Sequence, residues 1–174
     1  MTFPVFSAGE VLRAQDMNAV GLWLVKTQTV GTGVSSVVVS GAFSAEYDSY
    51  RIIYQNGVGS TPQGIAMNLG STTTGNLYQY CLSYVSYSGT QTNAGATTNS
   101  WAFIGESNTN SNLVCMDIHN PFLARYTLFS SQYLGSVAGF SAGQLTNTTS
   151  YTAFTLSVGG TMTGGTIAVY GYRK

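Results

Sequence analysis

The chain has 174 residues, of which only 12 are charged: six Lys or Arg and six Asp or Glu. This 7% is far below the ~25% of an ordinary soluble domain, and the formal net charge is zero. Six cations cannot form the basic surface that nucleic-acid binding requires, and a hydrophobic content of 44% excludes a charge-extended disordered chain.

The first predicted element is a helix over residues 14–25. Apolar side chains recur there at helical spacing, and Asp16 falls in the first turn, where the helix dipole favours an acid. Because so short a helix is marginal alone, we expect it to pack on a partner. We therefore expect residues 1–28 to form an arm for attachment or oligomer docking, followed by a β domain over residues 29–174. The predicted docking residues are Leu12, Asp16, Met17, Val20, Trp23 and Leu24.

After the arm, the pattern is typical of β-strands separated by turns. Phe154, Leu156 and Val158, for example, alternate with polar residues and are expected to share one face. The pattern predicts an all-β fold, an antiparallel β-sandwich or jelly-roll-like domain preceded by the short N-terminal helix. Strands are predicted at 37–39, 50–54, 65–69, 78–87, 113–119, 126–134, 137–145, 152–158 and 166–172. Loops rich in Gly, Ser, Asn and Thr are predicted at 70–75, 89–99, 108–112, 146–150 and 159–165.

Two long windows, residues 52–105 and 126–172, carry no charged side chain. Polar residues and Gly interrupt every apolar run before the ~20 residues of a membrane span, so no membrane insertion is expected. Soluble sheet proteins protect their edge strands with Lys, Pro or inward charges. The window 126–172 contains none of these, so we expect neighbouring subunits or a host assembly to cover its strand edges.

No catalytic, metal or cofactor site is predicted. The single histidine, His119, shares a strand face with Asp117, but no second His and no acidic cluster accompany them. A glycosidase needs two carboxylates across a cleft. Nothing in the spacing of the candidate acids selects such a pair among Glu46, Asp48, Glu106 and Asp117.

The two cysteines, Cys81 and Cys115, are too few for a disulfide framework. Their apolar neighbours indicate core strands. We interpret both as reduced, buried thiols of a protein made in a cytoplasm, and the N-terminus shows no secretory signal.

Aromatic residues make up 13% of the chain, and 12 of them are Tyr. Tyr and Trp can line a shallow glycan-binding face while their polar tips stay in water. We favour core or subunit-interface positions, because Tyr is common in ordinary sheets and interfaces. The candidates for receptor-facing loops are Tyr84, Tyr87, Trp101 and Tyr133.

Three parts of the chain resemble virion proteins of tailed bacteriophages. Residues 6–18 are similar to the G-x-V-L-T-A-x-D-L/M-N start of many tail-fibre and minor tail proteins, with Arg13 where Thr is usual. Residues 43–59 and 116–122 resemble a phage virion β-sandwich module, and residues 164–174 resemble its final strand.

The resemblance implies a non-enzymatic structural protein at the virion surface, made in the bacterial host cytoplasm. It implies a homotrimer that is anchored to other virion proteins of the tail or capsid by its N-terminal arm. The exposed sandwich is then a candidate for host attachment through a cell-surface glycan. Two alternatives stay open: a capsid decoration (cement) protein, and a glycan-degrading tail depolymerase.

Overall fold

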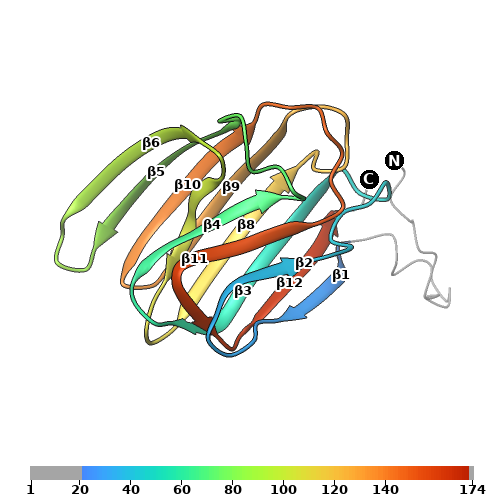
Figure 1. The fold of residues 1–174 in the computed structure, drawn as a ribbon. Coiled ribbons are helices and arrows are strands. Elements are labelled where there is room, and N and C mark those ends of the chain that lie inside the picture. The colour runs from blue at the N-terminus through green and yellow to red at the C-terminus, as the bar shows by residue number, and fades with distance from the viewer. Residues whose placement is uncertain (1–20, 173–174) are drawn as a thin grey trace, which may run out of the picture.

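The computed structural model describes residues 21–172, and every regular element in that range is a β-strand (Figure 1). The twelve strands are β1 (Leu22–Thr29), β2 (Val34–Val39), β3 (Ser49–Gly59), β4 (Gln63–Leu69), β5 (Tyr78–Ser86), β6 (Gln91–Thr98), β7 (Trp101–Ser107), β8 (Asn112–His119), β9 (Thr127–Leu134), β10 (Val137–Leu145), β11 (Phe154–Thr163) and β12 (Thr166–Tyr172). The predicted all-β, antiparallel character is confirmed.

Eight strands form one wide antiparallel sheet, in the order β6-β5-β10-β9-β8-β3-β12-β1. The other four form a smaller layer in the order β2-β11-β4-β7. The two are joined where Met162 and Thr163 of β11 pair with the end of β3. In Figure 1 the smaller layer lies over the middle of the wide sheet, and the β5–β6 hairpin extends past it.

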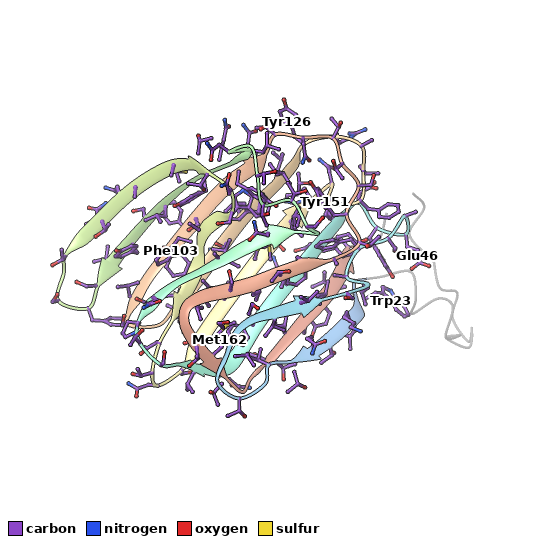
Figure 2. The ribbon with its side chains drawn as sticks, in the orientation of Figure 1. Trp23, Glu46, Phe103, Tyr126, Tyr151 and Met162 are labelled. Carbon is purple, nitrogen blue, oxygen red and sulfur yellow. The ribbon has the colours of Figure 1, made fainter. Side chains whose placement is uncertain are left out.

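The core lies between the two layers and follows from strand alternation. Along β9, buried and exposed residues alternate over the whole strand, because successive side chains point to opposite faces. Phe154 and Leu156 are buried and Val158 packs against them, so the predicted shared face of β11 is confirmed. Met162 is fully buried at the corner where the two layers join (Figure 2).

Aromatic rings connect the smaller layer to the wide sheet. Trp101, at the start of β7, lies 5.3 Å from Tyr78 and 4.5 Å from Phe129, measured between ring centroids. Its indole Nε1 donates a hydrogen bond of 3.2 Å to the carbonyl of Gln144 on β10. Phe103, labelled in Figure 2, continues these contacts toward the rings of the wide sheet. This network fixes the edge strand β7 over the inner face of the wide sheet, the face that points toward the smaller layer.

The predicted helix is wrong at its C-terminal end, because residues 22–25 belong to strand β1. This strand pairs with β12 from Leu22 opposite Tyr172 to Thr29 opposite Thr166. The apolar residues at its start fit helical spacing and a strand equally well, and the pairing with the far end of the chain decides between them. Residues 14–20 of the predicted helix lie outside the described residues. The expected domain division at 28/29 falls inside β1.

The prediction that strand edges in 126–172 need neighbouring subunits is also wrong. Strands β9, β10, β11 and β12 each have a paired neighbour of the same chain on both sides. Central strands need no edge charges, which explains the uncharged window. Within the described residues the edges are β1 and β6 of the wide sheet and β2 and β7 of the smaller layer.

Three strands, β1, β6 and β7, were not expected as strands. Residues 89–99 were predicted as a loop, but Gln91–Thr98 form β6. This strand has no large apolar side chain, so its sequence lacks the alternation that marks a half-buried strand. Strand β11 likewise continues to Thr163, into the loop predicted at 159–165.

We predict that Trp101→Ala lowers the free energy of unfolding by about 3–5 kcal/mol, because it removes a fully buried ring from the contacts between the layers. Tyr87→Ala is the matched control. Its side chain is 73% exposed, and its loss is expected to change stability by less than about 0.5 kcal/mol. Urea denaturation of the two variants measures both values. Equal stabilities would contradict the core role of Trp101.

Candidate interaction surface

The four aromatic residues predicted for receptor-facing loops do not form a surface site. Trp101 is 0% exposed and Tyr133 is 1% exposed, so the prediction is wrong for both: they point inward from strands that face the other layer. Tyr84 is half-buried and stacks on Phe103, with 5.7 Å between ring centroids. Only Tyr87, in the turn between β5 and β6, is largely exposed.

Of the predicted docking residues, the structure describes Trp23 and Leu24, which are neighbours on β1. Trp23 lies opposite Gly171 and is partly buried, whereas Leu24 lies opposite Tyr170 and is 57% exposed. The two side chains therefore point to opposite faces of the wide sheet. The docking role remains a prediction, and the rest of the set lies outside the described residues: Leu12, Asp16, Met17 and Val20.

Asp117 and His119 share one face of β8, as their spacing predicts, but each has its own partner. The Nδ1 atom of His119 lies 2.9 Å from the hydroxyl of Ser49, while Asp117 binds Arg51. Among residues 21–172, no three His, Cys, Asp or Glu side chains are grouped closely enough to hold a metal ion.

The carboxylate of Glu106 is buried and serves the turn between β9 and β10. It accepts hydrogen bonds from the backbone N–H and the hydroxyl of Ser136, at 2.6 and 2.8 Å, and from the N–H of Val137 at 3.1 Å. Asp117 lies on the opposite side of the wide sheet, facing away from the smaller layer. A glycosidase requires two acids that face each other across a cleft, and Glu106 and Asp117 do not have this arrangement.

We call the face of the wide sheet that points away from the smaller layer the outer face. Strand register places Ile53, Cys115, Gln132 and Phe140 next to one another across four of its strands. Seven of the ten exposed large apolar side chains among the described residues lie on this face. They are Leu22, Leu24, Val85, Leu113, Leu128, Leu134 and Phe140.

The salt bridge between Arg51 and Asp117 lies within this apolar face and is the one salt bridge of residues 21–172. It is bidentate: Nε donates to Oδ1 at 2.8 Å and Nη2 donates to Oδ2 at 2.6 Å. The Tyr172 hydroxyl donates a third hydrogen bond to this carboxylate, to Oδ1 at 2.6 Å. The guanidinium of Arg51 lies 5.7 Å from the centre of the Tyr172 ring. The charges of the pair thus cancel locally.

The protonation of this cluster is fixed near neutral pH. Burial alone would raise the pKa of Asp117, but hydrogen bonds from Arg51 and Tyr172 outweigh it and hold the pKa below its usual value. Desolvation, together with the hydrogen bond to Asp117, raises the pKa of Tyr172 to about 12. Asp117 is therefore ionised and Tyr172 protonated, and the cluster does not supply a proton-transfer group at pH 7.

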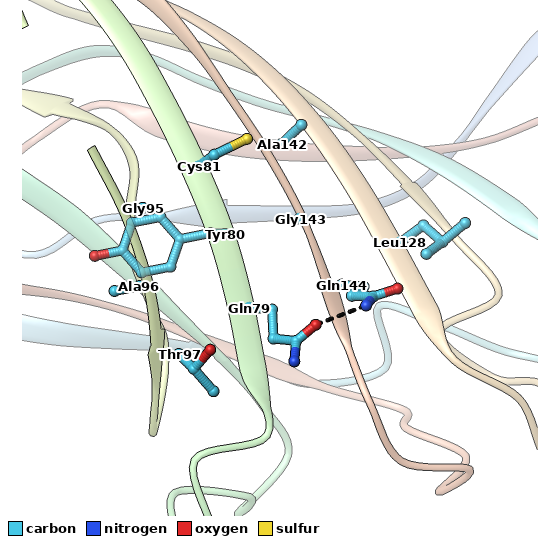
Figure 3. A pocket seen from close by; sticks show the side chains of 10 residues that line it. All are labelled: Gln79, Tyr80, Cys81, Gly95, Ala96, Thr97, Leu128, Ala142, Gly143 and Gln144. Atoms are coloured by element: carbon cyan, nitrogen blue, oxygen red, sulfur yellow. Dashed lines mark hydrogen bonds between the residues drawn. The ribbon is translucent and has the colours of Figure 1, made fainter. Parts of the chain in front are cut away.

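The outer face carries one broad, shallow groove and two smaller, more enclosed hollows. A groove of about 700 Å³ runs over β5, β6 and β10, lined by residues that include Cys81, Ala142 and Gly143 (Figure 3). The side chains of Gln79 and Gln144 are joined there by a hydrogen bond of 2.7 Å. Two further hollows, of about 430 and 330 Å³, both have Phe140 in their walls. Hollows beside a projecting ring are a shape into which another protein surface can pack.

The groove also corrects one expectation about the cysteines. Both Cys81 and Cys115 are free, but Cys81 is exposed on the outer face and Cys115 is only partly buried. The prediction of a buried thiol is therefore wrong for Cys81. Its apolar neighbours along the chain point inward, while the cysteine points outward.

The sequence carries one local signal for the outer face. Neighbouring residues on one strand are apolar at Leu113 and Val114, and again at Leu128 and Phe129. Since successive side chains point to opposite faces, such pairs predict a strand that is apolar on both faces. A strand that is apolar on both faces packs one face into the core and offers the other to a second packing partner.

No protein-family model, curated protein or solved structure matches this chain. In the described part of the chain, no helix is long and apolar enough to cross a membrane. The outer face is therefore the feature of the described residues that bears on function.

We predict that Asp117→Asn lowers the free energy of unfolding by about 1 kcal/mol at pH 7, because it removes a charge-assisted pair that is still partly exposed to solvent. The pKa of Asp117 is lowered by folding, so its stabilising effect is present above the unfolded pKa and is lost as pH falls through the folded pKa. The difference between wild type and variant should therefore shrink below pH ~4.

The matched control for this prediction is Glu46→Gln, at an exposed carboxylate. It is expected to change stability by less than about 0.5 kcal/mol. Urea denaturation across pH 3–7 gives all three curves. A wild-type advantage over Asp117→Asn that persists unchanged down to pH 3 would contradict the assignment.

Proposed function

We propose that this chain is a non-enzymatic structural subunit of a tailed-phage particle, and that its outer face packs against neighbouring subunits. The outer face is the observation that carries the proposal. It exposes seven large apolar side chains in one continuous sheet, and such a patch on a soluble protein usually marks an interaction site. A formal net charge of zero gives free monomers little repulsion to keep them apart.

The size of the outer face suits a stable interface. The eight strands lie ~4.8 Å apart, and each directs about four side chains to the outer face, ~6.8 Å apart along the strand. Multiplying the two dimensions gives a surface on the order of 900 Å². A standard protein–protein interface buries ~800 Å² on each partner. The face is therefore large enough to hold a subunit without help from another surface.

The resemblance of residues 6–18 and 164–174 to tail-fibre and related virion proteins supports the phage assignment. On this proposal the subunits form a homotrimer at the virion surface, and the N-terminal segment attaches it to other proteins of the tail or capsid. The enzyme alternative has less support, because Glu106 and Asp117 are each engaged by groups of the chain itself. Host attachment and capsid decoration both fit a structural subunit of this kind.

We predict that the double variant Leu134→Ser, Phe140→Ser folds but loses its association through the outer face. The two side chains are 49% and 58% exposed, so their loss costs the isolated subunit little while removing apolar contacts from the interface. Val38→Ser is the matched control, since Val38 is 56% exposed but lies on β2 of the smaller layer. Analytical ultracentrifugation compares the masses. A double variant that assembles like wild type would show that the outer face is not an interface.

The same variants test the function when they are expressed with a tag during phage infection. Wild type and Val38→Ser are expected in purified particles, and the double variant is expected to be depleted from them. Binding of the purified chain to host cells would assign host attachment. Particles that lack the chain and break at a lower temperature than wild-type particles would instead assign capsid decoration. Absence of the wild-type chain from particles, or release of reducing sugar from host polysaccharide, would overturn the proposal.

A further inference from the structure

Strand β6 is the outermost strand of the wide sheet at the end opposite β1. Within residues 21–172, β5 is its only partner, and the β5–β6 hairpin extends past the smaller layer (Figure 1). One edge of β6 therefore has no neighbouring strand among the described residues. An edge of this kind presents a row of backbone N–H and C=O groups to any strand that approaches.

The other three edges of the fold carry features that hinder strand addition. The pairing of β1 with β12 is irregular between Leu24 and Lys26, and Lys26 itself places a charge on that edge. Strand β7 has extra residues in its pairing with β4, and β2 is a short strand that keeps a continuous register with β11 only from Ser36 to Val39. Bulges and charges are the usual means by which proteins protect an edge.

Strand β6 has none of these features. Its register with β5 is continuous from Tyr78 opposite Thr98 to Val85 opposite Gln91. The strand contains no charged residue and no Pro, and its largest side chain is that of a glutamine. The edge is thus free of bulges, uncharged and lined by small or medium-sized side chains over eight residues.

The hydrogen-bond pattern shows which residues of β6 direct their backbone groups to the free edge. In the hairpin turn, the N–H of Ser86 donates to the carbonyl of Thr90 at 2.9 Å. Bonded and non-bonded pairs alternate in an antiparallel ladder, so the non-bonded pairs begin at Val85 and Gln91. The backbone groups that point away from β5 are therefore those of Gln91, Asn93, Gly95 and Thr97.

We propose that this edge binds a second copy of the chain, with β6 pairing antiparallel to β6 of that copy about a two-fold axis. Two identical edges can meet here without charge repulsion, because no side chain between residues 52 and 105 is charged. Two-fold pairing satisfies the free groups of both strands in one closed contact. It also leaves no new open edge, since the wide sheet of one subunit continues into that of the other.

This inference does not depend on the phage assignment, and it uses a different surface from the outer-face contact. The double variant Leu134→Ser, Phe140→Ser removes outer-face contacts and leaves the backbone of β6 unchanged. A β6 variant has the converse effect. The failure of one contact is therefore distinguishable from the failure of the other.

The test is Asn93→Pro, which removes a backbone N–H that points away from β5 and so spares the β5–β6 ladder. Proline is tolerated on an edge strand when its missing N–H faces outward. In analytical ultracentrifugation, wild type is expected to form assemblies with an even number of subunits, such as two outer-face trimers joined through β6, and Asn93→Pro is expected to halve that mass. Asn93→Ala, which keeps the N–H but removes the same polar side chain, is the matched control and should assemble like wild type.

Hydrogen exchange of the wild-type chain provides a second measurement that needs no variant. The amides of Asn93, Gly95 and Thr97 are expected to be protected at high concentration and to lose protection on dilution. A folded Asn93→Pro protein with wild-type mass would overturn the proposal, and so would free exchange of these amides in the assembled chain. Protection that appears only in the presence of a different protein would show that the edge binds that protein rather than a second copy.

Discussion

The structure depends on the unequal cover of the two faces of its eight-stranded sheet, since the four-stranded layer packs on the inner face alone. The smaller layer covers the inner face of the central strands, and this burial of Trp101, Tyr133 and their neighbours forms the core. The same chain supplies nothing among the described residues to cover the outer face. At ~25 cal/mol for each Å² of apolar surface removed from water, covering such a face stabilises an assembly substantially. On the proposed function, association is the consequence of a wide sheet that the described residues cover on one face only.

The Arg51–Asp117 pair lies on this uncovered outer face, so a partner that packs there would bury it further. A buried ion pair is costly unless its remaining hydrogen-bonding groups are satisfied. Here the carboxylate already accepts three hydrogen bonds, from Arg51 twice and from Tyr172. A partner that closes over the outer face then meets a locally neutral, largely satisfied cluster. In an otherwise apolar surface, such a polar cluster favours one docking register over others, as single polar residues do in coiled-coil interfaces.

The sequence predicted those parts of the fold that depend on local alternation. Phe154 and Leu156 were assigned to the core correctly, because one buried face is visible in the spacing of a single strand. Strand β6 was missed because an edge strand that buries little has no such alternation. The start of β1 was predicted as helix because the choice depends on β12, at the far end of the chain. The absence of charge from residues 126–172 is visible in the sequence, but its cause, the central position of strands β9 to β12, is a property of topology. Similarly, the outer face could not be assembled from sequence, since its seven exposed apolar residues come from five strands whose order in the sheet is not local.

The central claim is that the outer face is covered when the chain is assembled, and the two native cysteines test it directly. Cys81 and Cys115 both lie on that face, and no other cysteine is present to confuse the signal. The measurement is the rate of maleimide labelling at each thiol, in the dilute subunit and in the assembled protein, with the labelled positions identified by mass spectrometry. The account predicts that Cys81 reacts readily in the subunit and becomes protected on assembly. Equal labelling of Cys81 in both states would contradict it.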